Sequence, residues 1–218
     1  MNQDSKITVS VLMAVYNTPF SLVKRAIKSV LNQNFQDFEL LVLDDGSDLK
    51  LSMSLLKYCQ KYQNKISYIR MQNCGQSKAI NRGVHFSRGK YITIIDADDE
   101  YKANHLSTCI GEMEESDLIS SLTETIVNQE ADYFVPDKSD LQKNIHVDDC
   151  ILFATLFGKK EVFKNIGFKN MYSADSHFYE QAAAKYAVKK LKKRTYIYYR
   201  NIPTSITAKI KEERITLF

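Results

Sequence analysis

Two groups of aspartates follow two short apolar runs in the first half of the chain. The pair Asp44-Asp45 comes directly after the run 38–43, and the group Asp96-Ala97-Asp98-Asp99 comes after the run 91–95. Crowded carboxylates repel one another unless a positive charge lies between them. Oxygen ligands suit Mg²⁺ or Mn²⁺, and Mg²⁺ usually takes one or two carboxylates together with substrate phosphates. The two groups therefore predict a divalent cation beside a diphosphate, unless they serve only as turns and helix caps, which aspartate also favours.

The elements that position these aspartates form a regular alternation. Apolar segments of strand length are separated by helix patterns, in the order strand 8–15, helix 21–31, strand 38–43, helix 51–62, strand 66–71, helix 77–86 and strand 91–95. Repeated strand and helix units predict an α/β fold, a doubly wound and mostly parallel sheet with helices on both faces. Ligands of such sheets bind at the carboxyl ends of the strands, which is where both aspartate groups fall.

The second half of the chain is less regular. Its pattern predicts a helix at 104–115, strands at 118–127 and 131–135, a loop at 137–144, an apolar segment at 150–157, helices at 161–165 and 175–186, and a tyrosine-rich strand at 195–199. No repeat or linker divides the chain. We therefore expect one domain over residues 1–218, with a first half to about residue 105 and a smaller, mixed half over about 106–218.

Composition excludes several classes of protein. The chain has 218 residues, of which 44% are hydrophobic, and it contains only 7 Gly and 3 Pro, which excludes collagen-like and low-complexity chains. No apolar run approaches the roughly 18 residues that a transmembrane helix needs. The four cysteines are widely spaced and form no Cys-x-x-Cys pair, which argues against a zinc knuckle or a disulfide scaffold. These features predict a cytoplasmic protein.

Charge is unevenly distributed along the chain. The net charge is +4, but the residues from Lys185 onward carry +8, so the first 184 residues carry −4. The basic segment 185–200 is either a solvated face or a contact for anionic lipid headgroups or a phosphate-bearing substrate, which allows a peripheral position at a membrane. The acidic remainder would oppose a long phosphate track, so we expect no nucleic-acid partner.

Familiar phosphate-binding motifs are absent. The sequence has no Gly-x-x-x-x-Gly-Lys-Ser/Thr loop, no Gly-x-Gly-x-x-Gly after the first strand and no Gly-x-Ser-x-Gly turn. A diphosphate would therefore be held by a metal ion and scattered side chains rather than by a glycine-rich loop.

Several short motifs follow one another in a fixed order. They are Val9–Asn17, Ser29–Gln33, Phe38–Leu40, Asp44–Ser47, Asn73–Gly75, Ala79–Gly83 and Gly89–Ile92, followed by Asp96–Asp99. This series resembles the family 2 glycosyltransferases of the GT-A fold over about residues 7 to 107, and more weakly over 163–186 and 198–207.

The resemblance implies an inverting, metal-dependent glycosyltransferase of glycan or polysaccharide synthesis. It would transfer a sugar from a nucleotide-sugar, most commonly a UDP-sugar, to a hydroxyl of a glycan, a lipid-linked or a protein-linked acceptor. A non-catalytic nucleotide-sugar-binding subunit of an assembly complex is the alternative. A nucleotidyltransferase would need a glycine-rich basic loop after the first strand, and Tyr16–Pro19 is not one.

The resemblance also implies roles for individual residues. Asp45 would contact the base, Asp96 would face the ribose, and Asp98 with Asp99 would hold Mn²⁺ or Mg²⁺. The full set expected to bind the nucleotide-sugar is Ala14, Tyr16, Asn17, Asp45, Lys78, Arg82, Asp96 and Ala97. For Lys78 and Arg82 the alternative is a solvated surface charge.

Asp175 matches the family's general base, because the turn Ile166-Gly167-Phe168 precedes it. The alternative is that Asp175 caps the helix that follows. Three positions depart from the family pattern: Ala14 replaces a common Pro, Ala174 a common Glu, and Ile202 a frequent His. The missing Glu and His leave activity and metal dependence open.

Overall fold

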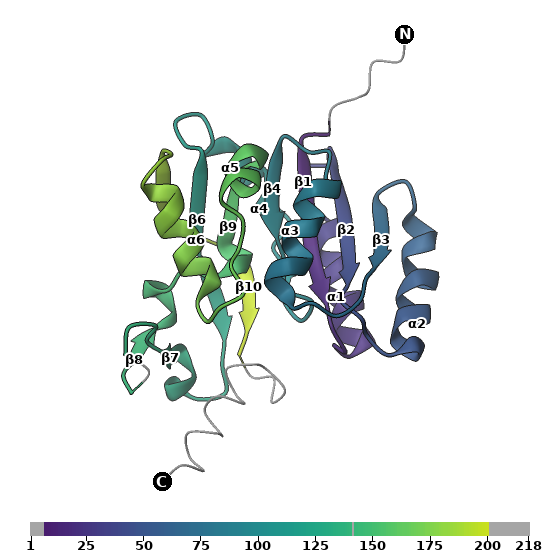
Figure 1. The fold of residues 1–218 in the computed structure, drawn as a ribbon, viewed down its shortest axis with the longest axis horizontal. Coiled ribbons are helices and arrows are strands. Elements are labelled where there is room, and N and C mark those ends of the chain that lie inside the picture. Colours follow the sequence, from purple (N-terminus) through teal and green to yellow (C-terminus); the bar gives the residue numbers. More distant parts are fainter. Residues whose placement is uncertain (1–6, 141, 201–218) are drawn as a thin grey trace.

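In a computed structural model, the described residues, 7–140 and 142–200, form an eight-stranded mixed sheet and a separate two-stranded hairpin (Figure 1). The sheet order is β3-β2-β1-β4-β9-β6-β10-β5. Its strands are β1 Val9–Val15, β2 Phe38–Asp44, β3 Ile66–Arg70, β4 Tyr91–Ile94, β5 Glu100–Tyr101, β6 Leu118–Ile126, β9 Leu156–Lys159 and β10 Val188–Tyr199. The hairpin pairs β7 Phe134–Pro136 with β8 Asn144–His146.

Six α-helices accompany these strands in the described part of the chain. They are α1 Phe20–Leu31, α2 Leu49–Cys59, α3 Gln76–Phe86, α4 His105–Gly111, α5 Lys160–Ile166 and α6 Ala174–Ala183. Short 3₁₀ turns occur at Gln60–Tyr62, Glu130–Tyr133, Val147–Asp149 and Phe153–Thr155. None of the helices described here is both long and apolar enough to cross a membrane.

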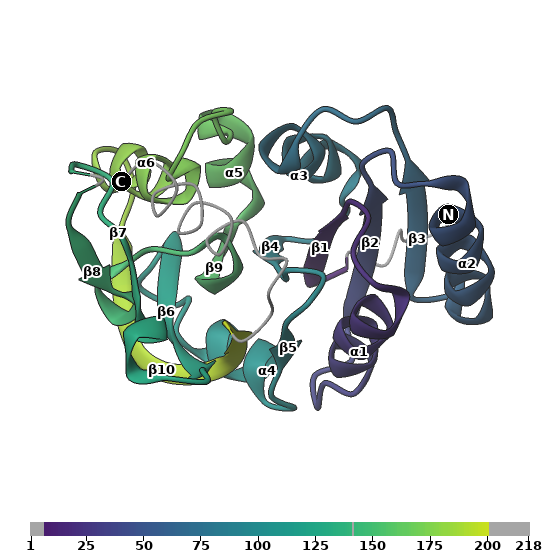
Figure 2. The same ribbon diagram turned by 90° about the horizontal axis from the view of Figure 1, so that it is seen from below.

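The central strands are apolar on both faces because helices cover both sides of the sheet, as Figure 2 shows. One core lies between the sheet and the helices α1, α2 and α4, and the other between the sheet and α3, α5 and α6. On α1 the buried residues Val23, Ala26, Ile27 and Val30 recur at helical spacing, so one stripe faces the sheet. The α/β architecture expected from the sequence is confirmed.

The register of the parallel strands brings the two aspartate groups to one edge. β1 pairs in parallel with β2 and with β4, so that Val15 lies opposite Asp44 and Leu12 opposite Ile94. The chain leaves β2 at Asp44 and β4 at Ile94, and the aspartates follow at the same edge of the sheet. Strand ends and helix starts therefore meet where a ligand can bind.

The second half joins the same sheet in a mixed orientation. β9 is antiparallel to both β4 and β6, whereas β10 is parallel to β6 with a bulge between Lys190 and Tyr196. β10 begins at Val188, not at residue 195, so the basic run lies inside the strand. In that run Lys189 pairs with Glu112 at 2.8 Å and Arg194 with Asp148 at 2.6 Å.

Candidate functional site

A cavity of about 540 Å³ lies at the edge of the sheet where β1, β2 and β4 end. It is lined from the first half by Ala14, Val15, Tyr16, Thr18, Asp45, Asn73, Gly75, Gln76, Asp96, Ala97, Asp98 and Asp99. From the second half it is lined by Leu152, Phe153, Ala154, Asp175, Tyr196, Tyr198 and Tyr199. The cavity thus draws on both halves of the chain.

Asp45 organises one wall of the cavity. Its carboxylate accepts hydrogen bonds from the backbone N–H groups of Cys74 and Gly75, each at 2.8 Å, and Asn73 Nδ2 donates to its carbonyl oxygen at 2.9 Å. Gly46 follows at φ +81°, and a Cβ there would lie 2.7 Å from the Asn73 backbone nitrogen. The two loops therefore approach so closely that only glycine fits between them.

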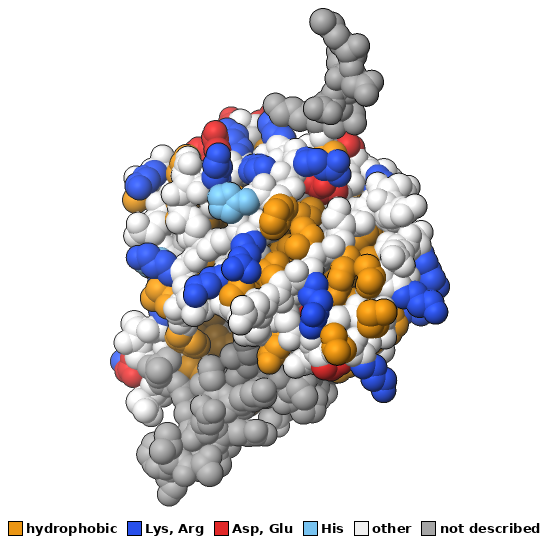
Figure 3. All heavy atoms as spheres, turned by 45° about the vertical axis from the view of Figure 1, so that its right-hand side comes forward, with side chains coloured by type: hydrophobic (Ala, Val, Ile, Leu, Met, Phe, Trp, Pro, Cys, Tyr) orange, Lys and Arg blue, Asp and Glu red, His pale blue; other side chains and the backbone are white. Residues whose placement is uncertain are grey.

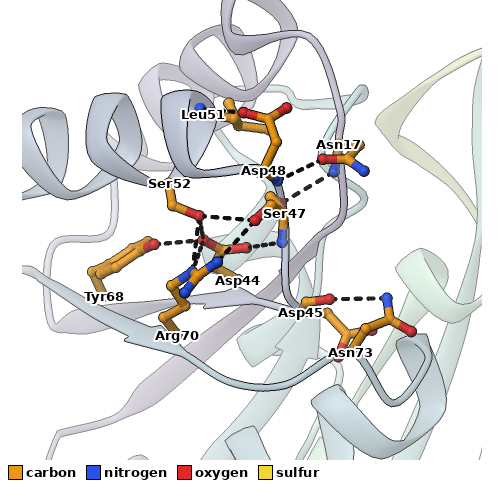
Figure 4. A network of polar contacts seen from close by, with 10 residues as sticks. All are labelled: Asn17, Asp44, Asp45, Ser47, Asp48, Leu51, Ser52, Tyr68, Arg70 and Asn73. Atoms are coloured by element: carbon orange, nitrogen blue, oxygen red, sulfur yellow. Dashed lines mark hydrogen bonds and ion pairs between the residues drawn. The ribbon is translucent and has the colours of Figure 1, made fainter.

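Asp44, the other member of the pair, turns away from the cavity into a network of its own (Figure 4). Its fully buried carboxylate accepts hydrogen bonds from the Ser47 N–H at 2.9 Å and from the hydroxyls of Ser52 and Tyr68. Arg70 Nε lies 3.6 Å from it. Burial alone would raise the pKa of Asp44, but these hydrogen bonds outweigh it and lower the pKa. Asp44 ends β2 with its carboxylate bound inside this network, so it does not line the cavity beside the second aspartate group, as the sequence had suggested.

The turn after β4 places two further carboxylates against the cavity. Gln76 Nε2 donates to Asp96 Oδ1 at 2.8 Å. Burial, together with the charges of Asp98 and Asp175, raises the pKa of Asp96 to about 7. Burial also raises the pKa of Asp98, against the effect of the Arg25 charge. Like charges in a poorly solvated cavity resist ionisation, and a cation among them would relieve that cost.

Asp99 is held by strand β10. Its side chain is 1% exposed, and its oxygens accept hydrogen bonds from the Tyr196 hydroxyl at 2.7 Å and the Tyr199 N–H at 2.8 Å. Burial and the nearby Asp96 and Asp98 raise the pKa of Asp99 well above its usual value. Of the two residues expected to bind metal, only Asp98 has a carboxylate to which no side chain in the described chain is hydrogen-bonded.

Asp175 faces the cavity from the first turn of α6. It accepts hydrogen bonds from the N–H groups of Ser176 at 2.8 Å and Phe153 at 3.2 Å. Burial outweighs these hydrogen bonds and raises the pKa of Asp175 to about 6. The N-cap of α6 is Ser173, in the left-handed region at φ +53°, so the structure does not support the alternative that Asp175 is the cap.

The remaining residues expected at the site differ in their placement. Ala14, Tyr16 and Ala97 line the cavity with the aspartates. Asn17 is not among the lining residues; it accepts a hydrogen bond from the Asp48 N–H at 2.9 Å and so braces the adjoining loop. Lys78 and Arg82 are exposed on α3 and do not line the cavity. Ile202 lies outside the described residues.

Several lining residues were not expected from the sequence. The tyrosine-rich segment 195–199 was recognised as a strand, but nothing in the sequence tied it to the cavity. Asn73 belongs to a motif whose family resemblance was noted without a role, and Gln76 follows that motif directly. For Phe153 we find no sequence signal, because its position depends on the 3₁₀ turn that leads into β9.

The side chains available at the cavity limit how a metal ion could bind there. Among residues 7–140 and 142–200, no group of three or more His, Cys, Asp or Glu side chains is arranged to hold a metal ion. A cation at this cavity would therefore take some of its ligands from a substrate. Mg²⁺ and Mn²⁺ commonly bind in this way, through one or two carboxylates and the phosphates of a ligand.

Comparison with known sequences identifies relatives among glycosyltransferases. An uncharacterized glycosyltransferase of Rickettsia bellii is 40% identical over 115 residues, which is 53% of this chain and 16% of the relative. The minor teichoic acid biosynthesis protein GgaB of Bacillus subtilis is 39% identical over 92 residues, 41% of this chain and 10% of that protein. The chain thus spans only a small part of the length of these relatives.

Solved structures share the fold. Staphylococcus aureus TarS 1-349 in complex with UDP-GlcNAc has a TM-score of 0.70 and 19% identity, covering 93% of this chain and 60% of that one. The mannosyltransferase PcManGT from Pyrobaculum calidifontis, in complex with GDP-Man and Mn²⁺, has a TM-score of 0.72 and 14% identity, covering 97% and 61%. The model of the family described as glycosyl transferase family 2 matches residues 10–178. The chain therefore belongs to glycosyl transferase family 2.

Proposed function

We propose that the chain is a nucleotide-sugar-dependent glycosyltransferase domain that transfers a sugar to an acceptor hydroxyl with inversion at the anomeric carbon. The observation that carries the proposal is one cavity that joins Asp45, Asp96 and Asp98 of the first half to Asp175 of the second. A nucleotide-binding edge and a candidate base in one cavity are what a single displacement requires, because the acceptor must attack opposite the leaving diphosphate.

Asp175 is the proposed general base. As the acceptor oxygen forms its bond to the anomeric carbon, the hydroxyl proton passes to the Asp175 carboxylate, and the bond between that carbon and the diphosphate breaks. A pKa of about 6 leaves Asp175 ionised at neutral pH and more basic than an ordinary aspartate. General base catalysis of this kind contributes about 10²- to 10⁴-fold in rate.

The first half is the proposed donor site. We assign the base to the wall formed by Asp45 and Tyr16, and the ribose to Asp96, whose carboxylate Gln76 orients. Asn17 acts on this wall through the loop that it braces. The charges of Lys78 and Arg82 oppose the rise in the pKa of Cys74 that burial causes, so both lie near the loop whose backbone binds the Asp45 carboxylate.

A divalent cation, Mn²⁺ or Mg²⁺, fits the donor set of this cavity. Hard oxygen ligands and carboxylates with raised pKa values favour such an ion, and PcManGT was solved with Mn²⁺. We assign Asp98 to it, and the family resemblance implies Asp99 as a second ligand. When bound, the ion would neutralise the charge that develops on the departing nucleoside diphosphate.

The donor and acceptor are proposed by class. TarS was solved with UDP-GlcNAc and PcManGT with GDP-Man. Of these two nucleotides, we propose UDP as the carrier of the sugar that this chain transfers. The name of GgaB supports a role in polysaccharide synthesis. The acceptor is accordingly proposed to be a glycan or a lipid-linked or protein-linked precursor of one. Peripheral membrane contact through residues 185–200 stays a prediction, and Glu112 and Asp148 already pair with two of its charges.

Thermal unfolding with UDP, GDP, dTDP and CDP, each with Mn²⁺ and with EDTA, tests the donor site. A nucleotide at about 100 times its dissociation constant adds about 2.7 kcal/mol of stability. One nucleotide that stabilises the chain only with Mn²⁺ would support the proposal, and no shift with any of them would contradict it. Binding without release of nucleoside diphosphate from any sugar donor, over a broad panel of acceptors, would instead favour a non-catalytic subunit.

A further inference from the structure

Strand β10 contributes three tyrosines to the cavity although it lies at the far side of the sheet from the donor-binding strands. Its last four residues pair with β6, and two of them, Tyr196 and Tyr199, also contact the turn after β4. The Tyr196 hydroxyl is completely buried; it accepts a hydrogen bond from the Asp96 N–H at 3.2 Å and donates one to Asp99 Oδ2 at 2.7 Å. One hydroxyl thereby spans both ends of the aspartate turn.

A second set of contacts repeats this connection at Tyr199. Its N–H donates to the other oxygen of Asp99 at 2.8 Å, and its hydroxyl donates to Glu100 Oε1 at 2.7 Å. Arg25 of α1 lies over the Tyr199 ring, 3.8 Å from its centre, and pairs with Glu100 at 3.3 Å. Arg25 also donates to the carbonyl oxygen of Asp98. Helix α1, the aspartate turn and β10 are therefore joined at one place.

Asp99 is the centre of this arrangement, since each of its oxygens is bound by a different residue of β10. Asp99 lines the cavity, but with 1% exposure it is almost completely enclosed by protein. A carboxylate that only held a cation would have no need of two donors from one strand. Hydrogen bonds to a carboxylate are among the stronger ones and fix its orientation.

We propose that Asp99 is a positioning residue, which fastens β10 to the aspartate turn and so places Tyr196, Tyr198 and Tyr199 as the acceptor-side wall, while cation binding depends on Asp98. This inference rests on the proposed function for its account of Asp98. It revises the expectation that Asp98 and Asp99 act as a pair of metal ligands. It also makes Tyr196 and Arg25 part of the site, although neither residue carries out the chemistry.

The experiment compares Asp99→Asn, Asp99→Ala and Asp98→Asn in the full chain by calorimetric titration with UDP and with GDP. The measured quantity is the ratio of the dissociation constant in EDTA to that in Mn²⁺. Asparagine has the shape of aspartate; its oxygen can accept from the Tyr199 N–H, and its amide can donate to the Tyr196 hydroxyl. A positioning residue is rescued by that substitution, whereas a metal ligand is not.

In Mn²⁺ we expect Asp99→Ala to weaken nucleotide binding about 10- to 100-fold, as the loss of a residue that orients a metal ligand does. Asp99→Asn should bind the nucleotide within about threefold of the unmodified chain. Asp98→Asn should bring the ratio close to one. The inference is overturned if Asp99→Asn abolishes the metal dependence as fully as Asp98→Asn does.

A thermal unfolding cycle keeps the inference testable when nucleotide binding fails. If the unmodified chain binds neither UDP nor GDP under either condition, the proposed function fails, and the attachment of β10 is judged by stability alone. Tyr196→Phe should then lower the melting temperature in the presence of Asp99 and lower it less beside Asp99→Ala, where only the contact with the Asp96 N–H is left to lose. Additive losses in the double variant would show that Asp99 and Tyr196 are not coupled, and would refute the attachment.

Discussion

Asp175→Asn should make the chain more stable and less active at the same time. The carboxylate is held in a cavity that disfavours its charge, and burial raises its pKa to about 6 from the usual 3.8. A pKa raised in the folded state means that stability is greatest below the unfolded value and decreases as the pH rises through the folded value. Asparagine carries no charge, so it avoids this loss.

The size of the effect follows from the two pKa values. Each unit of difference between the folded and unfolded pKa corresponds to about 1.36 kcal/mol. Ionisation of Asp175 therefore lowers the free energy of unfolding by up to about 3 kcal/mol at pH 8 and by about 1.5 kcal/mol at pH 5. The gain from Asp175→Asn should therefore grow by about 1.5 kcal/mol between pH 5 and pH 8. Urea unfolding of both forms at the two pH values measures it.

Asp117→Asn is the matched control. A hydrogen bond from Lys159 and another from the Ala187 N–H lower the pKa of Asp117, so this substitution should reduce stability at pH 8. In the same preparations Asp175→Asn should lower sugar transfer about 10²- to 10⁴-fold. A stability difference that does not change with pH, or transfer that persists in Asp175→Asn, would refute the assignment of Asp175 as a buried base.

Three further predictions concern the same edge of the sheet. The kcat/KM of sugar transfer should rise with pH through an apparent pKa near 6, set by Asp175, and an acid limb well below pH 5 would point to another group. Tyr68→Phe removes a hydroxyl that donates to the buried Asp44 carboxylate and should lower the free energy of unfolding by about 1.5–3 kcal/mol in urea at pH 7. Because the pKa of Asp44 is lowered, the stability lost in Tyr68→Phe should become smaller only as the pH falls below 3.8. A loss that stays constant at lower pH would show that the hydroxyl does not bind an ionised Asp44 carboxylate. Gly46→Ala places a Cβ 2.7 Å from the Asn73 backbone nitrogen at φ +81°, so this substitution should weaken nucleotide binding more than about ten-fold. The control is Gly111→Ala, whose Cβ would meet no atom within 4 Å and which should leave nucleotide binding unchanged in the same titration.

The sequence was sufficient for the first half of the fold because its signals there are local. Strands that are buried on both faces read as unbroken apolar runs, and parallel pairing brings their carboxyl ends together without further information. The positions of Asp45, Asp96 and Asp98 at the cavity follow from that register. The family motifs lie in the same segments, so pattern and resemblance support one another.

The second half depends on contacts that are distant in sequence. β10 begins seven residues earlier than its tyrosine-rich end suggests and pairs with β6 across a bulge, which no periodicity reveals. Within Asp44-Asp45, the choice of which carboxylate enters the cavity depends on the face of β2 that α2 and β3 cover. Asp99 takes its partners from residues about a hundred positions away, so the sequence could only group it with Asp98.

The position of β4 has a mechanical consequence for substrate entry. β4 is hydrogen-bonded to β1 on one side and to β9 on the other, so the two walls of the cavity belong to one continuous sheet. Enzymes whose substrate sites lie between separate domains close by rotation about a hinge. Here such a rotation would break the β4–β9 ladder, so the two walls of the cavity stay joined by the sheet. Adjustment to different ligands would therefore fall to the loops that follow the strands, while the spacing between the two walls is built into the sheet.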